Sequence, residues 1–302
     1  MEKNLALSFL FNLDPEIMYF SASTILIFVV CLGIIIGSLF IVDNCRSVRQ
    51  SKPKKCKIAF GGCARNIDSY LSTAFNNMYT LAKHFTDNNN NNDYKIVIYH
   101  NDSHDNTLAI LKSYESRDPD HVIIIDRHDP SESRIKRLAR GRNLVLETIQ
   151  RECSDYDYFF NVDLDDRFPV LAKNNFQHVN SLLKRNDWDV LSFNQRHSYY
   201  DIYALRTNED PENCWSDHLK GSEVYRLTVK YHQLFNQGDP STLIPVISAF
   251  GGFGIYRLSK TINCKYESED EQGKEDCEHV SFHRNMRTLH HANIFVVPIE
   301  MS

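Results

Sequence analysis

The sequence predicts an α/β fold with a mostly parallel sheet that helices cover on both faces. Two observations lead to this prediction. From residue 57 onward, short apolar runs alternate with longer segments of helical periodicity, and this alternation is typical of parallel sheets with crossover helices. In addition, one apolar run ends abruptly in acidic residues, as expected where a buried strand reaches the ligand-binding edge of such a sheet.

The first predicted elements are a strand at 57–60 and a helix that follows Gly61 and Gly62. Apolar side chains recur in this helix with a period close to 3.6 residues, which predicts one packed face. They are Ile67, Leu71, Ala74, Phe75, Met78, Leu81, Ala82 and Phe85. After an asparagine-rich loop, we expect a strand at 95–99, a helix at 107–116, a strand at 122–125 and a helix at 132–152.

The next strand, within 156–168, ends in three carboxylates, Asp163, Asp165 and Asp166. Because side chains alternate along a strand, Asp163 and Asp165 should point the same way. Clustered carboxylates repel one another unless a cation neutralises them, and ligands that are all oxygen suit Mg²⁺ or Mn²⁺. We therefore predict a divalent metal site at this strand end. The alternative is that these acidic residues cap a helix or lie in a loop and bind no metal.

Arg142 falls near the middle of an apolar stripe on the predicted helix at 132–152. The stripe consists of Ile135, Leu138, Ala139, Val145, Leu146 and Ile149. Burying a guanidinium without a partner would cost several kcal/mol, so Arg142 requires an anion. Two partners remain open. One is an internal carboxylate from Asp163, Asp166 or Glu147, and the other is a diphosphate, which a bidentate guanidinium fits.

The composition is that of a globular protein. The 302 residues are 42% apolar, which suffices for a core in one large or two modest domains. A net charge of -5 argues against a dedicated nucleic-acid binder. The eight cysteines are scattered and include no Cys-x-x-Cys pair, so they indicate neither a disulfide framework nor a zinc site.

Residues 17–42 contain no charged side chain. As a helix they would span roughly 39 Å, more than the hydrocarbon core of about 30 Å. We predict a tail at 1–16, a transmembrane anchor at 17–42, a basic linker at 43–56 and one domain at 57–302. A cleaved signal peptide is the alternative, but such peptides usually have a shorter apolar region and a basic N-terminal flank.

Four segments together resemble the fungal capsule-associated α-1,3-mannosyltransferase family. They are RIKRLARGRNLVLE at 134–147, WDVLSF and YYDIYALR within 188–206, AFGGFGIYR at 249–257 and DCEHVSFHRNMR at 276–287. The acid cluster also resembles the Asp-x-Asp signature of GT-A glycosyltransferases. The resemblance covers roughly 57–298 and implies a GT-A-like fold, a GDP- or UDP-hexose donor and Mn²⁺ or Mg²⁺. The strand end is richer in acid than that family's pattern, which leaves mannose open as the sugar.

The resemblance and the residue types together assign the candidate site. Late in the chain, His279 and His283 lie four residues apart and would share a helix face beside Glu278. Gly251 and Gly252 permit either close approach of a ligand or a tight bend. We predict donor binding by Arg65, Arg134, Arg142, Asn143 and Asp163; substrate contacts by Tyr200, Asp201, Arg206, Gly251 and Gly252; metal binding by Asp163, Asp165, Asp166 and His283; and catalysis by Glu278 or Asp276.

The predicted function is metal-dependent transfer of a hexose to a hydroxyl acceptor on a glycan or glycoconjugate. A nucleotidyltransferase, or a membrane-anchored binding protein with a degenerate site, remains the alternative. The family resemblance favours a secretory-pathway membrane, in the Golgi or endoplasmic reticulum. In contrast, the basic residues after the apolar segment favour a domain in the cytosol, so the orientation stays open.

Overall fold

The structure is a computed structural model that describes residues 55–86, 93–130, 133–165, 173–195, 199, 201–215, 221–236, 239 and 241–301. Its eight-stranded sheet has the order β3-β2-β1-β4-β7-β5-β8-β6. The strands are β1 (Ile58–Ala64), β2 (Tyr94–His100), β3 (Val122–Asp126), β4 (Tyr158–Val162), β5 (Val190–Gln195), β6 (Ile244–Pro245), β7 (Phe253–Arg257) and β8 (Ile294–Met301).

Strands β3, β2, β1 and β4 are parallel neighbours, and β5 is parallel to β8. Strand β7 is antiparallel to both β4 and β5, and β6 is antiparallel to β8. All strands except β6 and β7 therefore run in one direction, which confirms the predicted mixed α/β fold with a mostly parallel sheet.

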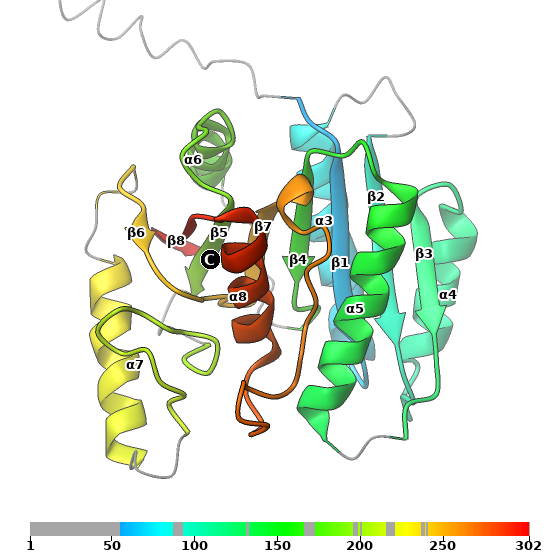
Figure 1. The fold of residues 1–302 in the computed structure, drawn as a ribbon. Coiled ribbons are helices and arrows are strands. Elements are labelled where there is room, and N and C mark those ends of the chain that lie inside the picture. Colours follow the sequence, from blue (N-terminus) through cyan, green and yellow to red (C-terminus); the bar gives the residue numbers. More distant parts are fainter. Residues whose placement is uncertain are drawn as a thin grey trace, which may run out of the picture. The chain divides into compact units, whose positions relative to one another are not determined.

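Helices cover both faces of this sheet (Figure 1). They are α3 (Asp68–Phe85), α4 (Thr107–Arg117), α5 (Arg134–Glu152), α6 (Lys173–Leu183), α7 (Gly221–Asn236) and α8 (Glu278–His290), with a short 3₁₀ turn at Leu258–Lys260. Because side chains alternate along β1, Phe60 joins a core with α3, while Ala59 joins a separate core with α5 and α8. The two cores explain why the central strands are apolar on both sides.

Helix α5 packs closely on β1 and β2 because glycine occupies two contact points. A Cβ at Gly61 would come within 2.5 Å of a Val145 methyl group, and one at Gly141 would collide with the Tyr99 ring. Gly61 also lies within β1, which continues to Ala64. The prediction that the first strand ends before Gly61 is wrong. Helix α5 begins at Arg134, where the Ser133 hydroxyl accepts a hydrogen bond from the Lys136 amide at 3.2 Å.

The predicted transmembrane anchor at 17–42 lies outside the described residues, as do the tail at 1–16 and most of the linker at 43–56. Within the part of the chain that is described, no helix is long and apolar enough to cross a bilayer. The predicted localisation as a single-pass membrane protein is therefore withdrawn, because no described helix supports it.

Candidate functional site

A pocket of about 270 Å³ lies beyond the carboxyl ends of β1, β2 and β4. This volume is close to the lower end of the range for small-molecule sites, about 300–1,000 Å³. Ala64 ends β1, Asn101 follows β2 and Asp163 follows β4, and all three line the pocket. The prediction that ligand-binding residues gather at this edge of the sheet is thus supported by the position of the cavity.

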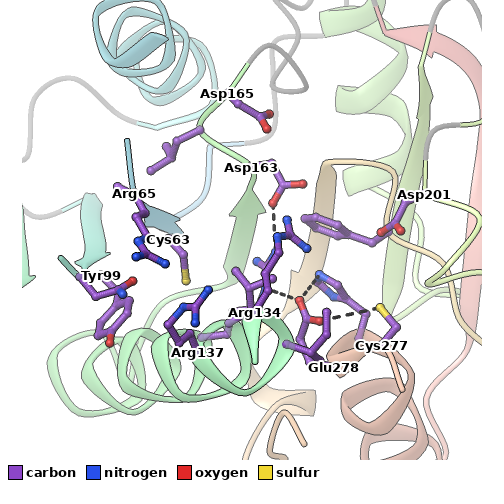
Figure 2. Close-up of a pocket in the computed structure, with 18 of the residues that line it drawn as sticks. Cys63, Arg65, Tyr99, Arg134, Arg137, Asp163, Asp165, Asp201, Cys277 and Glu278 are labelled. Atoms are coloured by element: carbon purple, nitrogen blue, oxygen red, sulfur yellow. Dashed lines mark hydrogen bonds and ion pairs between the residues drawn. The ribbon is translucent and has the colours of Figure 1, made fainter. Parts of the chain in front are cut away.

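Arginine side chains line one part of the pocket (Figure 2). Arg65 follows β1, Arg134 is the first residue of α5, and Arg137 lies one turn further along that helix. Arg65 and Arg134 are exposed, and neither forms an ion pair with any described residue. Two guanidinium groups that no described residue pairs with are therefore available to an anionic ligand.

Carboxylates line another part of the same pocket: Asp163, Asp165, Asp201 and Glu278. Strand β4 ends at Val162, so Asp163 and Asp165 follow the strand rather than lying on it. The third acid of the predicted cluster, Asp166, lies outside the described residues. The pocket therefore combines free positive charge with clustered negative charge.

Arg142 is buried, as its place in the apolar stripe predicted, and all three of its nitrogens donate to protein groups. Nε donates to Glu278 at 3.0 Å, one terminal nitrogen donates to Asn161 at 2.9 Å, and the other donates to Asp163 at 3.0 Å. Burial opposes its charge, but Asp163 and Glu278 raise the pKa of Arg142 well above its ordinary value. The internal partner that the sequence left open is present, and it joins β4 to α8.

Gly251 and Gly252 hold the main chain of Asp163. The Asp163 amide donates to the Gly252 carbonyl oxygen at 2.9 Å. Gly251 has φ of 76°, and a Cβ there would overlap the Phe193 carbonyl oxygen. Neither glycine lines the pocket, so the structure favours the tight bend over the predicted substrate contact.

Asp201 faces the pocket near Tyr203 and Phe250. Its Oδ1 accepts a hydrogen bond from the Ala204 amide at 3.2 Å. Burial, together with the charges of Asp163 and Glu278, raises the pKa of Asp201 to about 7. Asp201 was predicted as a substrate contact, and its position in the pocket is compatible with that role. Tyr200, predicted beside it, lies outside the described residues.

His279 is a pocket residue that was considered in the sequence but not assigned to the site. Its ring is 1% exposed and stacks on Phe250, with centroids 3.9 Å apart. Neither ring nitrogen has a hydrogen-bond partner among the described residues. Burial lowers the pKa of His279 well below its ordinary value, so the ring is neutral at pH 7 and offers one donor and one acceptor.

His283 is not placed to bind a metal, and this prediction is corrected. Nδ1 pairs with the Ser248 hydroxyl at 2.8 Å and Nε2 pairs with the Tyr256 hydroxyl at 3.1 Å. Burial lowers the pKa of His283 to about 3. With both nitrogens paired in the core, the neutral ring has a structural role.

Three further predicted site residues form hydrogen bonds or ion pairs with other residues of the chain instead of lining the pocket. Asn143 donates to the Tyr266 carbonyl oxygen and accepts from the Tyr266 amide, both at 2.8 Å. Arg206 is buried and pairs with Asp276 at 2.6 Å. None of Asn143, Arg206 and Asp276 lines the pocket beyond β4. They were predicted to bind the donor, contact the substrate and act in catalysis, respectively, but their polar groups are used within the protein.

Asp163 and Asp165 fit a divalent cation that arrives with a ligand. No group of three His, Cys, Asp or Glu side chains that could hold a metal occurs among the described residues. Magnesium sites, however, commonly use one or two carboxylates and complete their shell with substrate phosphates. Asp163 uses Oδ1 to accept from Arg142 and has no hydrogen bond to Oδ2 from a described residue. The pair therefore fits a site shared with a phosphate ligand.

No family model and no curated protein matches the chain, so the resemblance to the fungal capsule-associated family is not confirmed. Among solved structures, residues 1–349 of S. aureus TarS have 14% identity and a TM-score of 0.44, with 81% of this chain and 58% of that chain covered. The mannosyltransferase PcManGT from Pyrobaculum calidifontis, in complex with GDP-Man and Mn²⁺, has 11% identity and a TM-score of 0.46, with 85% and 63% covered.

TarS 1–349 in complex with UDP-GlcNAc gives a TM-score of 0.43 at 15% identity, with 81% of this chain and 56% of that chain covered. This chain thus spans less than two thirds of the length of each of these structures. Similarity at this level carries no conclusion about activity or ligand, which must come from the pocket itself.

Proposed function

We propose that this protein is a metal-dependent glycosyltransferase of GT-A-like fold. It would move a hexose, with mannose among the candidates, from a GDP- or UDP-hexose to a hydroxyl of a glycan or glycoconjugate. One observation carries the proposal: Arg65 and Arg134, whose guanidinium groups pair with no described residue, line the same pocket as the Asp163 and Asp165 carboxylates.

The arginines fit a diphosphate because a planar guanidinium can donate two parallel hydrogen bonds to phosphate oxygens. Asp163 and Asp165 alone would repel such a ligand, so their place beside the arginines is explained if the donor binds with Mn²⁺ or Mg²⁺ between them. When bound, the cation would neutralise negative charge on the nucleoside diphosphate as it leaves. Arg65 and Arg134 would stabilise the same charge in a partly desolvated pocket.

Arg142 has a supporting role in this scheme. Its donors are directed at Asp163, Glu278 and Asn161, so it fixes two pocket carboxylates rather than reaching for the donor. Glu278 lines the pocket, in keeping with its predicted place near the acceptor, but its Oε1 already accepts from Arg142. Asp276, the other predicted catalytic acid, is paired with Arg206 outside the pocket.

Asp165→Asn tests the metal and the transfer together. The amide keeps the shape but removes a charge that holds the cation, so Mn²⁺-dependent hydrolysis of GDP- and UDP-hexoses should fall at least about 100-fold, the scale of several kcal/mol of charge stabilisation. The melting temperature should change little. Asp120→Asn, an exposed site before β3, is the matched control.

Retained hydrolysis in Asp165→Asn, or full activity of the unmodified protein in excess EDTA, would contradict metal dependence. Release of hexose 1-phosphate with GMP or UMP, instead of free sugar with GDP or UDP, would favour a nucleotidyltransferase, because the bond broken would then lie between the two phosphates. Absence of both nucleotide binding and turnover would favour a binding protein with a degenerate site.

A further inference from the structure

The carboxylates in and near the pocket differ in whether an arginine side chain forms an ion pair with them. Glu278 and Asp163 share Arg142, each at 3.0 Å. Asp276 pairs with Arg206 at 2.6 Å and is not among the residues that line the pocket. An ion-paired carboxylate is a weak proton acceptor, because accepting a proton would leave its arginine without a counter-charge.

Asp201 differs from these acids. Among the described residues, the one hydrogen bond to its side chain is the 3.2 Å contact from the Ala204 amide, and none of these residues forms an ion pair with it. Its side chain lines the pocket, and Figure 2 shows it on the side of the cavity away from Arg65. A group bound between Asp201 and the arginines would therefore have a proton acceptor at one side and diphosphate ligands at the other.

We propose that Asp201 is the catalytic proton acceptor of this pocket, an inference that rests on the proposed glycosyl transfer. The Asp201 carboxylate takes the proton of the acceptor hydroxyl. The hydroxyl oxygen forms a bond to the anomeric carbon of the hexose, and the bond from that carbon to the phosphate oxygen breaks. The nucleoside diphosphate leaves with the electron pair of the broken bond, so no further reactant is needed.

The protonation behaviour of Asp201 agrees with this assignment. Burial first, and then the charges of Asp163 and Glu278, raise the pKa of Asp201 to about 7, while the Ala204 amide and Arg142 act in the opposite direction. The other titratable groups that interact with it are Tyr199, Tyr256, Cys214 and Cys277, and burial raises the pKa of each, so they stay neutral near pH 7. A general base works best when its pKa lies near the working pH.

The test compares Asp201→Asn with the unmodified protein, using a panel of GDP- and UDP-hexoses with Mn²⁺. Water is the acceptor in one series, and azide in the other. Water must lose a proton when it attacks, whereas azide has none to lose. We expect Asp201→Asn to lower hydrolysis about 100-fold or more, to bind GDP or UDP with Mn²⁺ within about threefold of the unmodified protein, and to form glycosyl azide at least as fast.

Two further variants control the result. Asp120→Asn makes the same chemical change at an exposed position outside the pocket and should leave both reactions unchanged. Asp201→Ser also lacks the carboxylate and should repeat the Asp201→Asn pattern. Since ionised Asp201 is repelled by its neighbours, the melting temperature of Asp201→Asn without metal should exceed that of the unmodified protein at pH 8, and the difference should shrink at pH 5.

Three results would overturn the assignment. Hydrolysis by Asp201→Asn within about threefold of the unmodified protein would remove Asp201 from the reaction and leave the proposed function standing. Equal loss of the water and azide reactions, with nucleotide binding intact, would make Asp201 a positioning residue. If the unmodified protein neither binds GDP or UDP with Mn²⁺ nor hydrolyses any donor, the proposed function fails and the role of Asp201 fails with it.

Discussion

Arg142 illustrates which properties of a single residue can be predicted from sequence. Its burial followed from its position in an apolar stripe, and burial alone required an anionic partner. Asp163 was among the candidates because it ends the next strand. Glu278 was not, because it lies 136 positions away and no local pattern connects the two. The same limit applies to Asn143 and His283, since a motif shows that a polar residue is constrained but not whether it faces a ligand or the core.

Replacing Arg142 with methionine should therefore destabilise the fold rather than only weaken ligand binding. Asp163 and Glu278 would be left as buried carboxylates without a cation, a situation that costs about 3–5 kcal/mol at neutral pH. The deficit should shrink toward acidic pH, because burial raises the pKa of Asp163 and Arg142 opposes that rise. Without Arg142 the Asp163 carboxyl is protonated at a higher pH, and protonation removes its uncompensated charge. Urea unfolding followed by circular dichroism measures the change.

The double variant Arg142→Met with Glu278→Gln is the control for this prediction. It removes one of the two uncompensated charges, so it should recover part of the lost unfolding free energy. A single-variant loss below about 1 kcal/mol would show that solvent, rather than Arg142, compensates these carboxylates.

At the scale of elements, the first half of the sheet was predictable and the second half was not. Strands β1 to β4 alternate with helices, so hydrophobic periodicity alone places them. Strand β7 instead enters antiparallel between β4 and β5, and its pairing with β4 joins residues almost a hundred positions apart. The register of this pairing depends on the turn at Gly251 and Gly252. The sequence alone does not show whether such a glycine pair forms a turn or allows a ligand to approach the backbone.

Gly251→Ala should disturb this turn and, through it, Asp163. Gly273 is a matched control, because its φ of 77° is close to the 76° of Gly251, but no atom lies within 4 Å of a Cβ built there. Gly273→Ala should cost about 1–2 kcal/mol of unfolding free energy from the backbone alone. Gly251→Ala should cost clearly more, because its Cβ also overlaps the Phe193 carbonyl oxygen, and it should weaken Mn²⁺ binding. Equal losses in the two variants would show that this overlap relaxes without cost.

At the scale of the whole molecule, the pocket is assembled from both halves of the sheet. Arg65 and Arg134 come from the β1 and α5 region, whereas Asp201 and Glu278 come from the segment after β5 and the start of α8. Sequence reasoning found the edge of the sheet where they meet, because parallel strands end together there. It could not separate pocket residues from core residues in the second half, where loops rather than regular alternation place the side chains.

A ligand that contacts both halves binds only the folded chain, so it should stabilise the whole molecule. At about one hundred times its dissociation constant, GDP or UDP with Mn²⁺ should add about 2.7 kcal/mol and raise the melting temperature by about 5–10 °C. Nucleotide in EDTA should add much less, because Asp163 and Asp165 would then repel the diphosphate.

Arg134→Ala should weaken binding of GDP or UDP with Mn²⁺ about tenfold or more, the scale of a charged hydrogen bond. Arg151→Ala, at an exposed site at the opposite end of α5, should have no effect. Equal stabilisation with and without metal, or equal losses from the two arginine variants, would place the nucleotide elsewhere than in this pocket.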